Sequence, residues 1–209
     1  LETADSTRKN LRQLIELLSQ ETRADNIHII GYSAGSRLAF EAVYDLALQY
    51  PEGRSGAPRL GKLVLIGSDV DRSYFAQALD DGVLRLTDEV AVYMSSTDAA
   101  LRMSSLVLGV DRLGQVFEAQ TEYDREIART LRTIDGLTLI DVSDAEGSSF
   151  GNGHSYFRSS PWASSDMFVS LIYDLDAEAR GLQQLSADSP VWSFPSDYPT
   201  RIVNAVKNR

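Results

Sequence analysis

The sequence contains no cysteine in its 209 residues. This absence excludes thiol catalysis, Cys-ligated zinc, iron–sulfur clusters and a disulfide framework. Histidine is almost as scarce, because the chain has only His28 and His154. No cluster of further ligands accompanies either histidine, and the acidic pair Asp80-Asp81 is typical of a solvated helix face. We therefore predict neither a metal nor a cofactor.

Basic residues are also in short supply. Twenty Lys and Arg stand against thirty Asp and Glu, which gives a formal net charge of −10. A negative surface repels phosphate backbones, so we predict no nucleic-acid partner. No apolar run approaches the roughly 20 residues of a membrane-spanning helix. A chain of this size with 43% hydrophobic residues can bury a core without a disulfide or a metal, and we predict one domain over residues 1–209.

Short apolar runs alternate with segments of helical period along the chain. Strands are expected at 27–30, 60–67, 90–94 and 137–142. Helices are expected around 11–18, 36–46, 71–79, 122–131 and 167–175, with a further helical stretch from about residue 99. Near-continuous apolar strands separated by helices predict an α/β fold, a mostly parallel sheet with helices on both faces.

Two segments depart from this alternation. The stretch 147–160 is rich in Gly and Ser and is predicted to be a loop. The tail 186–209 carries Pro190, Pro195 and Pro199 and is predicted to run irregularly over the surface before a short final helix.

The sequence Gly31-Tyr32-Ser33-Ala34-Gly35 is a G-x-S-x-G motif that a predicted strand enters and a predicted helix leaves. In such a tight reversal the central residue adopts strained backbone angles, and side chains at the two glycines would collide. The turn therefore predicts a nucleophilic Ser33 above the carboxyl edge of the sheet, where ligands bind in open α/β sheets. The alternative is a tight turn whose serine only caps the helix.

A serine nucleophile needs a base, usually histidine. His28 lies within the strand, about 16 Å before Ser33 at strand rise, and is expected to be a hydrogen-bonded core residue. His154 lies in the glycine-flanked segment Gly151-Asn152-Gly153-His154, from which it can reach across a site. We therefore expect His154 to be the base, with a solvated surface imidazole as the alternative.

The base needs a carboxylate at the end of another strand to orient it. Asp98 follows the strand 90–94 and is favoured, although it also suits the N-cap of the next helix. The rivals are Asp69, Asp71 and Asp141, and Asp71 is expected to cap the helix that follows it. With Asp98 the chain order is Ser33, Asp98, His154, the order typical of α/β-hydrolases.

Four blocks of the chain resemble a known family. The segments IHIIGYSAGSRLAFEA, LVLIGSDVDRSYF, VYMSSTDAALRMS and NGHSYFRSSP look like the bacterial α/β-hydrolase family DUF900, up to about Leu175. The resemblance implies an α/β-hydrolase fold with Ser33, Asp98 and His154 at the triad positions. One departure is Tyr32, because such enzymes often have histidine before the nucleophile.

A larger departure concerns the segment before Ser33. In α/β-hydrolases an earlier strand, ending in a His-Gly-type loop, supplies the second donor of the oxyanion hole, beside a first donor at the backbone N–H of Ala34. One donor is worth about 10²–10³ in rate. Only one helix precedes Ser33, so we expect the N-terminal strands to have been cleaved or omitted, or to be replaced by another chain. The nucleophile strand is then expected to have an open edge.

These observations predict a serine hydrolase that cleaves a small-molecule ester through an acyl-enzyme. The alternatives are a non-catalytic binding or assembly module on a hydrolase scaffold, and an acyltransferase with the same triad. Tyr32 and Tyr156 are candidate substrate-lining residues. Further aromatic residues near the expected loops are Tyr74, Phe75, Phe157 and Trp162, although aromatic residues at such spacings more often belong to the core.

Overall fold

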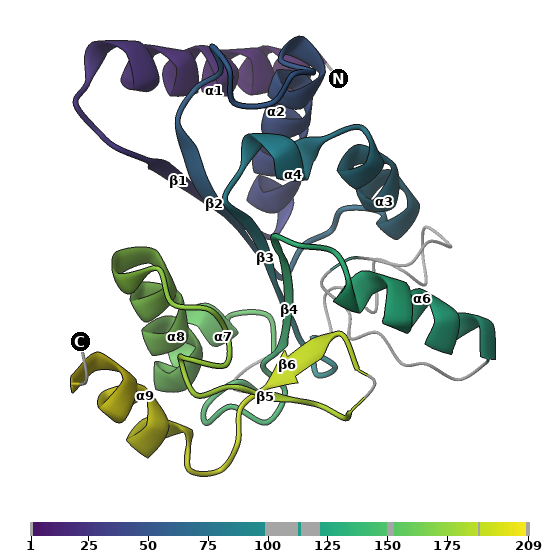
Figure 1. Ribbon diagram of the computed structural model, residues 1–209, viewed down its shortest axis with the longest axis vertical. Helices are drawn as coiled ribbons and strands as arrows, with labels where there is room; N and C mark the ends of the chain where they lie inside the picture. Colours follow the sequence, from purple (N-terminus) through teal and green to yellow (C-terminus); the bar gives the residue numbers. More distant parts are fainter. Residues whose placement is uncertain (1, 99–112, 114–121, 150–152, 188, 208–209) are drawn as a thin grey trace.

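In the described part of the chain the protein folds around a six-stranded sheet with strand order β1-β2-β3-β4-β6-β5 (Figure 1). This computed structural model describes residues 2–98, 113, 122–149, 153–187 and 189–207. The strands are β1 Ile27–Tyr32, β2 Leu60–Ile66, β3 Glu89–Met94, β4 Leu137–Asp141, β5 Gln183–Gln184 and β6 Val191–Ser193. The pairs from β1 through β6 are parallel, and β5 alone runs antiparallel to β6. The prediction of a mostly parallel α/β sheet is confirmed.

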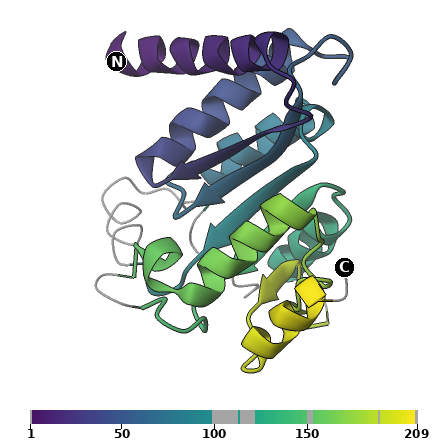
Figure 2. The ribbon, with the colours of Figure 1, turned by 90° about the vertical axis from the view of Figure 1, so that its left-hand side faces the viewer.

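Helices cover both faces of this sheet (Figures 1 and 2). One face carries α1 Glu2–Glu21, α2 Ala34–Gln49, α3 Arg72–Asp80, α4 Val83–Leu86 and α6 Glu122–Arg132. The other face carries α7 Tyr156–Ser159, α8 Pro161–Tyr173 and α9 Tyr198–Lys207. Since each parallel strand returns through a helix, all the central strands end at the same edge.

The central strands are mainly apolar because both of their faces are buried. Leu63, Leu65 and Val92 point into the core beneath α2 and α3, whereas Val64 and Tyr93 point into the core beneath α8. This alternation divides the interior into two hydrophobic layers, one on each side of the sheet.

Strand β1 differs from this pattern. The prediction of a buried strand is wrong there, because β1 alternates between half-buried and exposed positions and Ile30 is 54% exposed. Within the described residues β1 pairs with β2 alone, so it lies at the edge of the sheet, as expected for the nucleophile strand.

Two further expectations differ from the structure, and a third is not tested by the described residues. The helix predicted around 11–18 extends over Glu2–Glu21, and of its apolar positions Ile15 is buried whereas Leu14 and Leu18 are exposed. The stretch 147–160 is not all loop, since α7 lies within it. The helical stretch expected from about residue 99 lies outside the described residues, apart from Leu113.

The tail from residue 186 is only partly irregular. Val191–Ser193 forms β6, which pairs with β4 and buries Val191 completely. The final helix is present as α9, and Tyr198 at its start is buried. The tail therefore completes the sheet and its second covering layer.

Candidate active site

Ser33 occupies the sharp turn between β1 and α2. Its backbone angles are φ 52° and ψ −128°, and the other non-glycine residue with positive φ in the described chain is Asp174. Such angles are strained for a residue with a side chain and occur at functional turns. The Ser33 side chain makes no capping hydrogen bond to α2. The helix-capping alternative for this serine therefore fails, and the turn places Ser33 at the carboxyl edge of the sheet, directly after β1.

The two glycines of the motif have different roles. A Cβ on Gly31 would lie 2.6 Å from Ser36 Cα and 3.1 Å from Ala39 Cβ, so a side chain there is excluded. A Cβ on Gly35 would meet nothing within 4 Å. The expected collision at Gly35 is therefore wrong, because α2 turns this position outward while Gly31 faces the first turn of the helix.

Hydrogen bonds to residues outside the G-x-S-x-G motif hold the elbow in place. The Ser33 N–H donates to Ile66 O at the end of β2 over 2.9 Å. The buried Ser36 hydroxyl donates to Ser33 O at 2.5 Å and lies 2.9 Å from Ser68 Oγ. Ala34 begins α2, so its N–H has no preceding helical carbonyl to bond and points from the positive end of the helix dipole.

His154 and Asp98 form a direct pair. Their Nδ1 and Oδ2 atoms lie 2.6 Å apart, with the Asp98 side chain fully buried and that of His154 12% exposed. The imidazole also lies against the Tyr32 ring, with centroids 5.1 Å apart. Because Tyr32 immediately precedes Ser33, the histidine from beyond β4 and the aspartate from beyond β3 meet beside the elbow that follows β1.

Gly67 forms the floor under this pair. A Cβ there would lie 3.1 Å from His154 Cε1 and 3.5 Å from Asp98 Oδ2, and the residue has φ +51°. A side chain would therefore enter the space of the imidazole and strain the backbone as well. This role of Gly67 was not predicted from the sequence, although a glycine directly after an apolar strand was the signal that could have revealed it.

The rival carboxylates have other partners. Asp69 forms an ion pair with Arg37 at 2.8 Å. Asp71 caps α3, as predicted, by accepting hydrogen bonds from Ser73 N and Tyr74 N. Asp141 accepts from the Ser143 N–H at 2.8 Å, and burial raises the pKa of its carboxyl. Of the four candidates, Asp98 is the one that contacts His154.

His28 is not the core residue expected. It is exposed on β1, and its Nδ1 accepts a hydrogen bond from the Lys62 N–H at 3.0 Å. The β1–β2 register shifts between Ile27 and Ile29, so the ring nitrogen bonds an amide of β2 at the irregularity. This is a local structural role at the opposite end of the strand from Ser33.

Tyr156 does not fit the expectation that it lines a substrate site. Its side chain is fully buried, and its hydroxyl is hydrogen-bonded to the backbone of β3 and to Gly67. Tyr32, by contrast, is half-buried and packs on Phe157 with a centroid distance of 4.4 Å. These two rings beside His154 form an aromatic wall.

The other aromatic residues expected near the site pack elsewhere. Phe75 is buried under α2, and Tyr74 lies edge-on to Phe40 and Tyr44. Trp162 packs against Tyr198 of α9.

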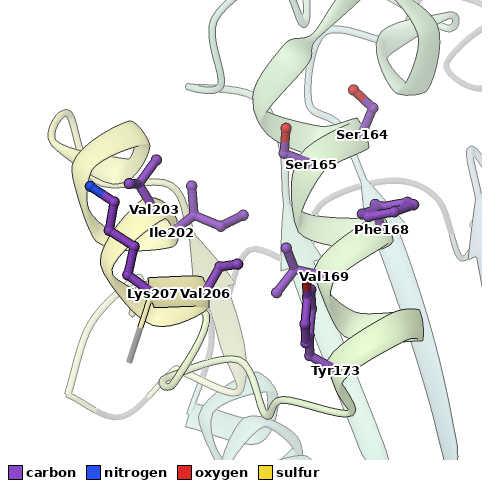
Figure 3. A pocket seen from close by; sticks show the side chains of 9 residues that line it. All are labelled: Ser164, Ser165, Phe168, Val169, Tyr173, Ile202, Val203, Val206 and Lys207. Carbon is purple, nitrogen blue, oxygen red and sulfur yellow. The ribbon is translucent and has the colours of Figure 1, made fainter. Parts of the chain in front are cut away.

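A cavity of about 530 Å³ lies between α8 and α9, away from this site (Figure 3). Its wall is mainly apolar and includes Phe168 and Val169 from α8 with Ile202, Val203 and Val206 from α9. None of the predicted site residues lines it.

The described residues contain neither a metal-ligand cluster nor a membrane-spanning helix. No group of three or more His, Asp or Glu side chains in them could hold a metal ion. Among the helices described, none is long and apolar enough to cross a membrane.

Comparison with known proteins places this architecture in a family. No curated protein and no solved structure matches the chain. One family model does match, over residues 2–171, a span that includes the elbow, Asp98 and His154. Since that span covers most of the chain, the protein belongs to the family described as alpha/beta hydrolase of unknown function, DUF900.

Proposed function

We propose that this protein is a serine hydrolase that cleaves a carboxylic ester by acyl transfer. Ser33 is the nucleophile, His154 the general base and acid, and Asp98 the group that orients the imidazole. The backbone N–H of Ala34 donates to the oxyanion.

The observation that carries the proposal is the 2.6 Å contact between His154 Nδ1 and a fully buried Asp98 carboxylate. With the Nδ1 proton donated to Asp98, the other ring nitrogen, Nε2, keeps its lone pair and can accept a proton. A solvated surface imidazole would not be held in this way. Tyr32 lies against the same ring, and the next residue, the strained Ser33, supplies the hydroxyl that such a base would activate.

The reaction follows from these positions. Ser33 Oγ forms a bond to the carbonyl carbon as its proton passes to His154 Nε2, and the negative charge on the carbonyl oxygen faces the Ala34 N–H. The C–O bond to the alcohol then breaks, and the imidazolium returns its proton to the leaving alcohol. Water attacks the acyl-enzyme by the same route and releases the acid.

The aromatic wall of Tyr32 and Phe157 supports an apolar acyl group. Both rings are half-buried, and the Arg158 guanidinium carbon lies 5.4 Å from the Phe157 centroid at the outer side of the wall. Apolar acyl chains bury against such rings by the hydrophobic effect.

A fluorophosphonate probe is expected to label the wild-type protein on Ser33, because the probe reacts with serines activated by a neighbouring base. Intact mass measurement and peptide mapping identify the site. Ser33→Ala should abolish the labelling, whereas Ser73→Ala, which removes an exposed serine of α3, should leave it unchanged. An unlabelled wild-type protein would favour the non-catalytic binding module.

A further inference from the structure

The Tyr156 hydroxyl connects the ends of two central strands. It accepts a hydrogen bond from the Gly67 N–H at 2.6 Å and donates one to Tyr93 O at 2.7 Å. The β2–β3 ladder reaches the pair Ile66 and Tyr93, and Gly67 is the next residue. The Gly67 N–H also reaches Tyr93 O at 3.3 Å, so the phenol oxygen lies at the last link between the two strands.

This hydroxyl acts on the segment that also holds Ser33. Ile66 O accepts from the Ser33 N–H, and the following residue, Gly67, donates to Tyr156. The elbow and Tyr156 are thus fixed to two consecutive residues at the end of β2. Any movement of Gly67 therefore changes the position of the backbone beside which the His154 imidazole and the Asp98 carboxylate lie.

The loop that carries His154 is held on both sides of the histidine. Tyr156 follows it by two residues and is anchored to Gly67 and Tyr93. Gly153 precedes it with φ +70° and packs so closely on the Thr97 backbone that a Cβ would clash there. Thr97 is the neighbour of Asp98, so the Gly153 contact ties the histidine to the segment that carries its carboxylate partner. Tyr156 ties the histidine to the end of β2, to which the Ser33 N–H is bonded.

We propose that Tyr156 is a positioning residue that sets the His154 imidazole relative to Ser33 through its two backbone hydrogen bonds. The inference rests on the proposed function, since positioning matters for catalysis only if Ser33 and His154 react. A phenylalanine would fill the same apolar space, so the role belongs to the hydroxyl. Burial raises the pKa of Tyr156 well above its ordinary value, which keeps the hydroxyl neutral and able to donate and accept.

Tyr156→Phe tests the proposal against a matched control. Tyr198→Phe also removes one buried tyrosine hydroxyl, which donates to Asp166 at 3.1 Å. Steady-state hydrolysis of p-nitrophenyl butyrate should show kcat lowered about 10–100-fold in Tyr156→Phe with KM within about twofold, because small misplacements of reacting groups cost about this much. Tyr198→Phe should keep kcat within about twofold despite a lower Tm. Equal kcat in the two variants would overturn the proposal.

The NMR signals of the His154 imidazole test the positioning role independently of the proposed ester hydrolysis. With only two histidines in the chain, the ¹⁵N and ¹H signals of the His154 ring can be assigned by comparison with His154→Ala. Tyr156→Phe should shift them and Tyr198→Phe should not, whether or not the protein turns over an ester. Unshifted His154 signals in Tyr156→Phe would overturn the positioning role, whereas failed labelling of Ser33 would overturn the function alone.

A second variant covers the case in which Tyr156→Phe does not fold. Para-aminophenylalanine at position 156 keeps a donor for Tyr93 O and a weaker acceptor for the Gly67 N–H. It should fold and give a kcat between those of the wild type and a tenfold loss, with the His154 signals shifted. Because this variant keeps both hydrogen bonds, a folded protein whose kcat fell more than about 100-fold would contradict the positioning role, since the loss would then not depend on these bonds.

Discussion

Asp98→Asn is expected to lower kcat for an activated ester by about 10⁴-fold, with a much smaller change in KM. The carboxylate lies 2.6 Å from His154 Nδ1 and is fully buried, so it holds the ring and stabilises the imidazolium formed during the reaction. An asparagine amide can donate to Nδ1, which moves the ring proton to Nε2 and removes the lone pair that accepts the Ser33 proton. The measurement is the initial rate of p-nitrophenyl butyrate hydrolysis at saturating substrate.

The matched control for this variant is Asp71→Asn. Asp71 also follows a strand of the same sheet edge, but its side chain caps α3, and asparagine caps a helix as well as aspartate does. Its kcat and Tm should therefore stay close to those of the wild type. If Asp98→Asn kept more than a tenth of the wild-type kcat while folded, Asp98 would not be the orienting acid.

The central strands could be predicted from the sequence because their environment is uniform. The runs at 60–67, 90–94 and 137–142 are mainly apolar, and β2, β3 and β4 occupy those positions. Burial on both faces requires such runs, so composition alone reveals them. Strand β6 has only three residues in a proline-rich tail, and its pairing with β4 depends on contacts distant in sequence.

Exposure was harder to predict than element type. The run at 27–30 is as apolar as a central strand, yet Ile30 is exposed because β1 lies at the sheet edge. Leu14 and Leu18 have the spacing of a buried helical face, but α1 contacts α2 partly through ion pairs such as Arg8 with Asp45. Apolar periodicity predicts which face of a helix or strand is apolar. It does not predict whether another element of the fold covers that face.

Some residues of the candidate site could likewise be predicted from the sequence, and others could not. Ser33 is predictable because a local motif dictates its turn, and Asp98 and His154 follow from strand order. The roles of Gly67, Ser36 and Tyr156 depend on contacts between segments that no local pattern connects, such as the 89 positions that separate Gly67 from Tyr156. The assignment of Tyr156 to the substrate wall failed for this reason.

A buried polar network was also invisible in the sequence. Asp166 of α8 accepts from Arg180 Nε at 2.8 Å, from the Tyr93 hydroxyl at 2.6 Å and from the Tyr198 hydroxyl at 3.1 Å. Arg180 and Asp166 are both fully buried. Burial disfavours the charged guanidinium, but the Asp166 carboxylate outweighs this and raises the pKa of Arg180, so the ion pair persists. The network joins β3, α8, the segment between α8 and β5, and the first residue of α9.

Asp166→Asn is expected to lower the free energy of unfolding by about 3–5 kcal/mol, since it leaves the Arg180 charge buried without its counterion. This is a large part of the roughly 5–15 kcal/mol that stabilises a typical domain. Urea denaturation followed by circular dichroism measures the change. The control is Asp88→Asn, which breaks the exposed pair with Arg54 and should cost at most about 1 kcal/mol.

The double variant Asp166→Leu/Arg180→Met separates the cost of an orphaned charge from the worth of the pair. Removing both charges eliminates the uncompensated guanidinium, and replacing a buried ion pair by apolar side chains is often neutral for stability. We expect the double variant to recover at least half of the loss caused by Asp166→Asn, although the Tyr93 and Tyr198 hydroxyls lose their acceptor. If the double variant were less stable than Asp166→Asn, the carboxylate would act mainly as the acceptor for the two tyrosines, and the ion pair with Arg180 would be secondary.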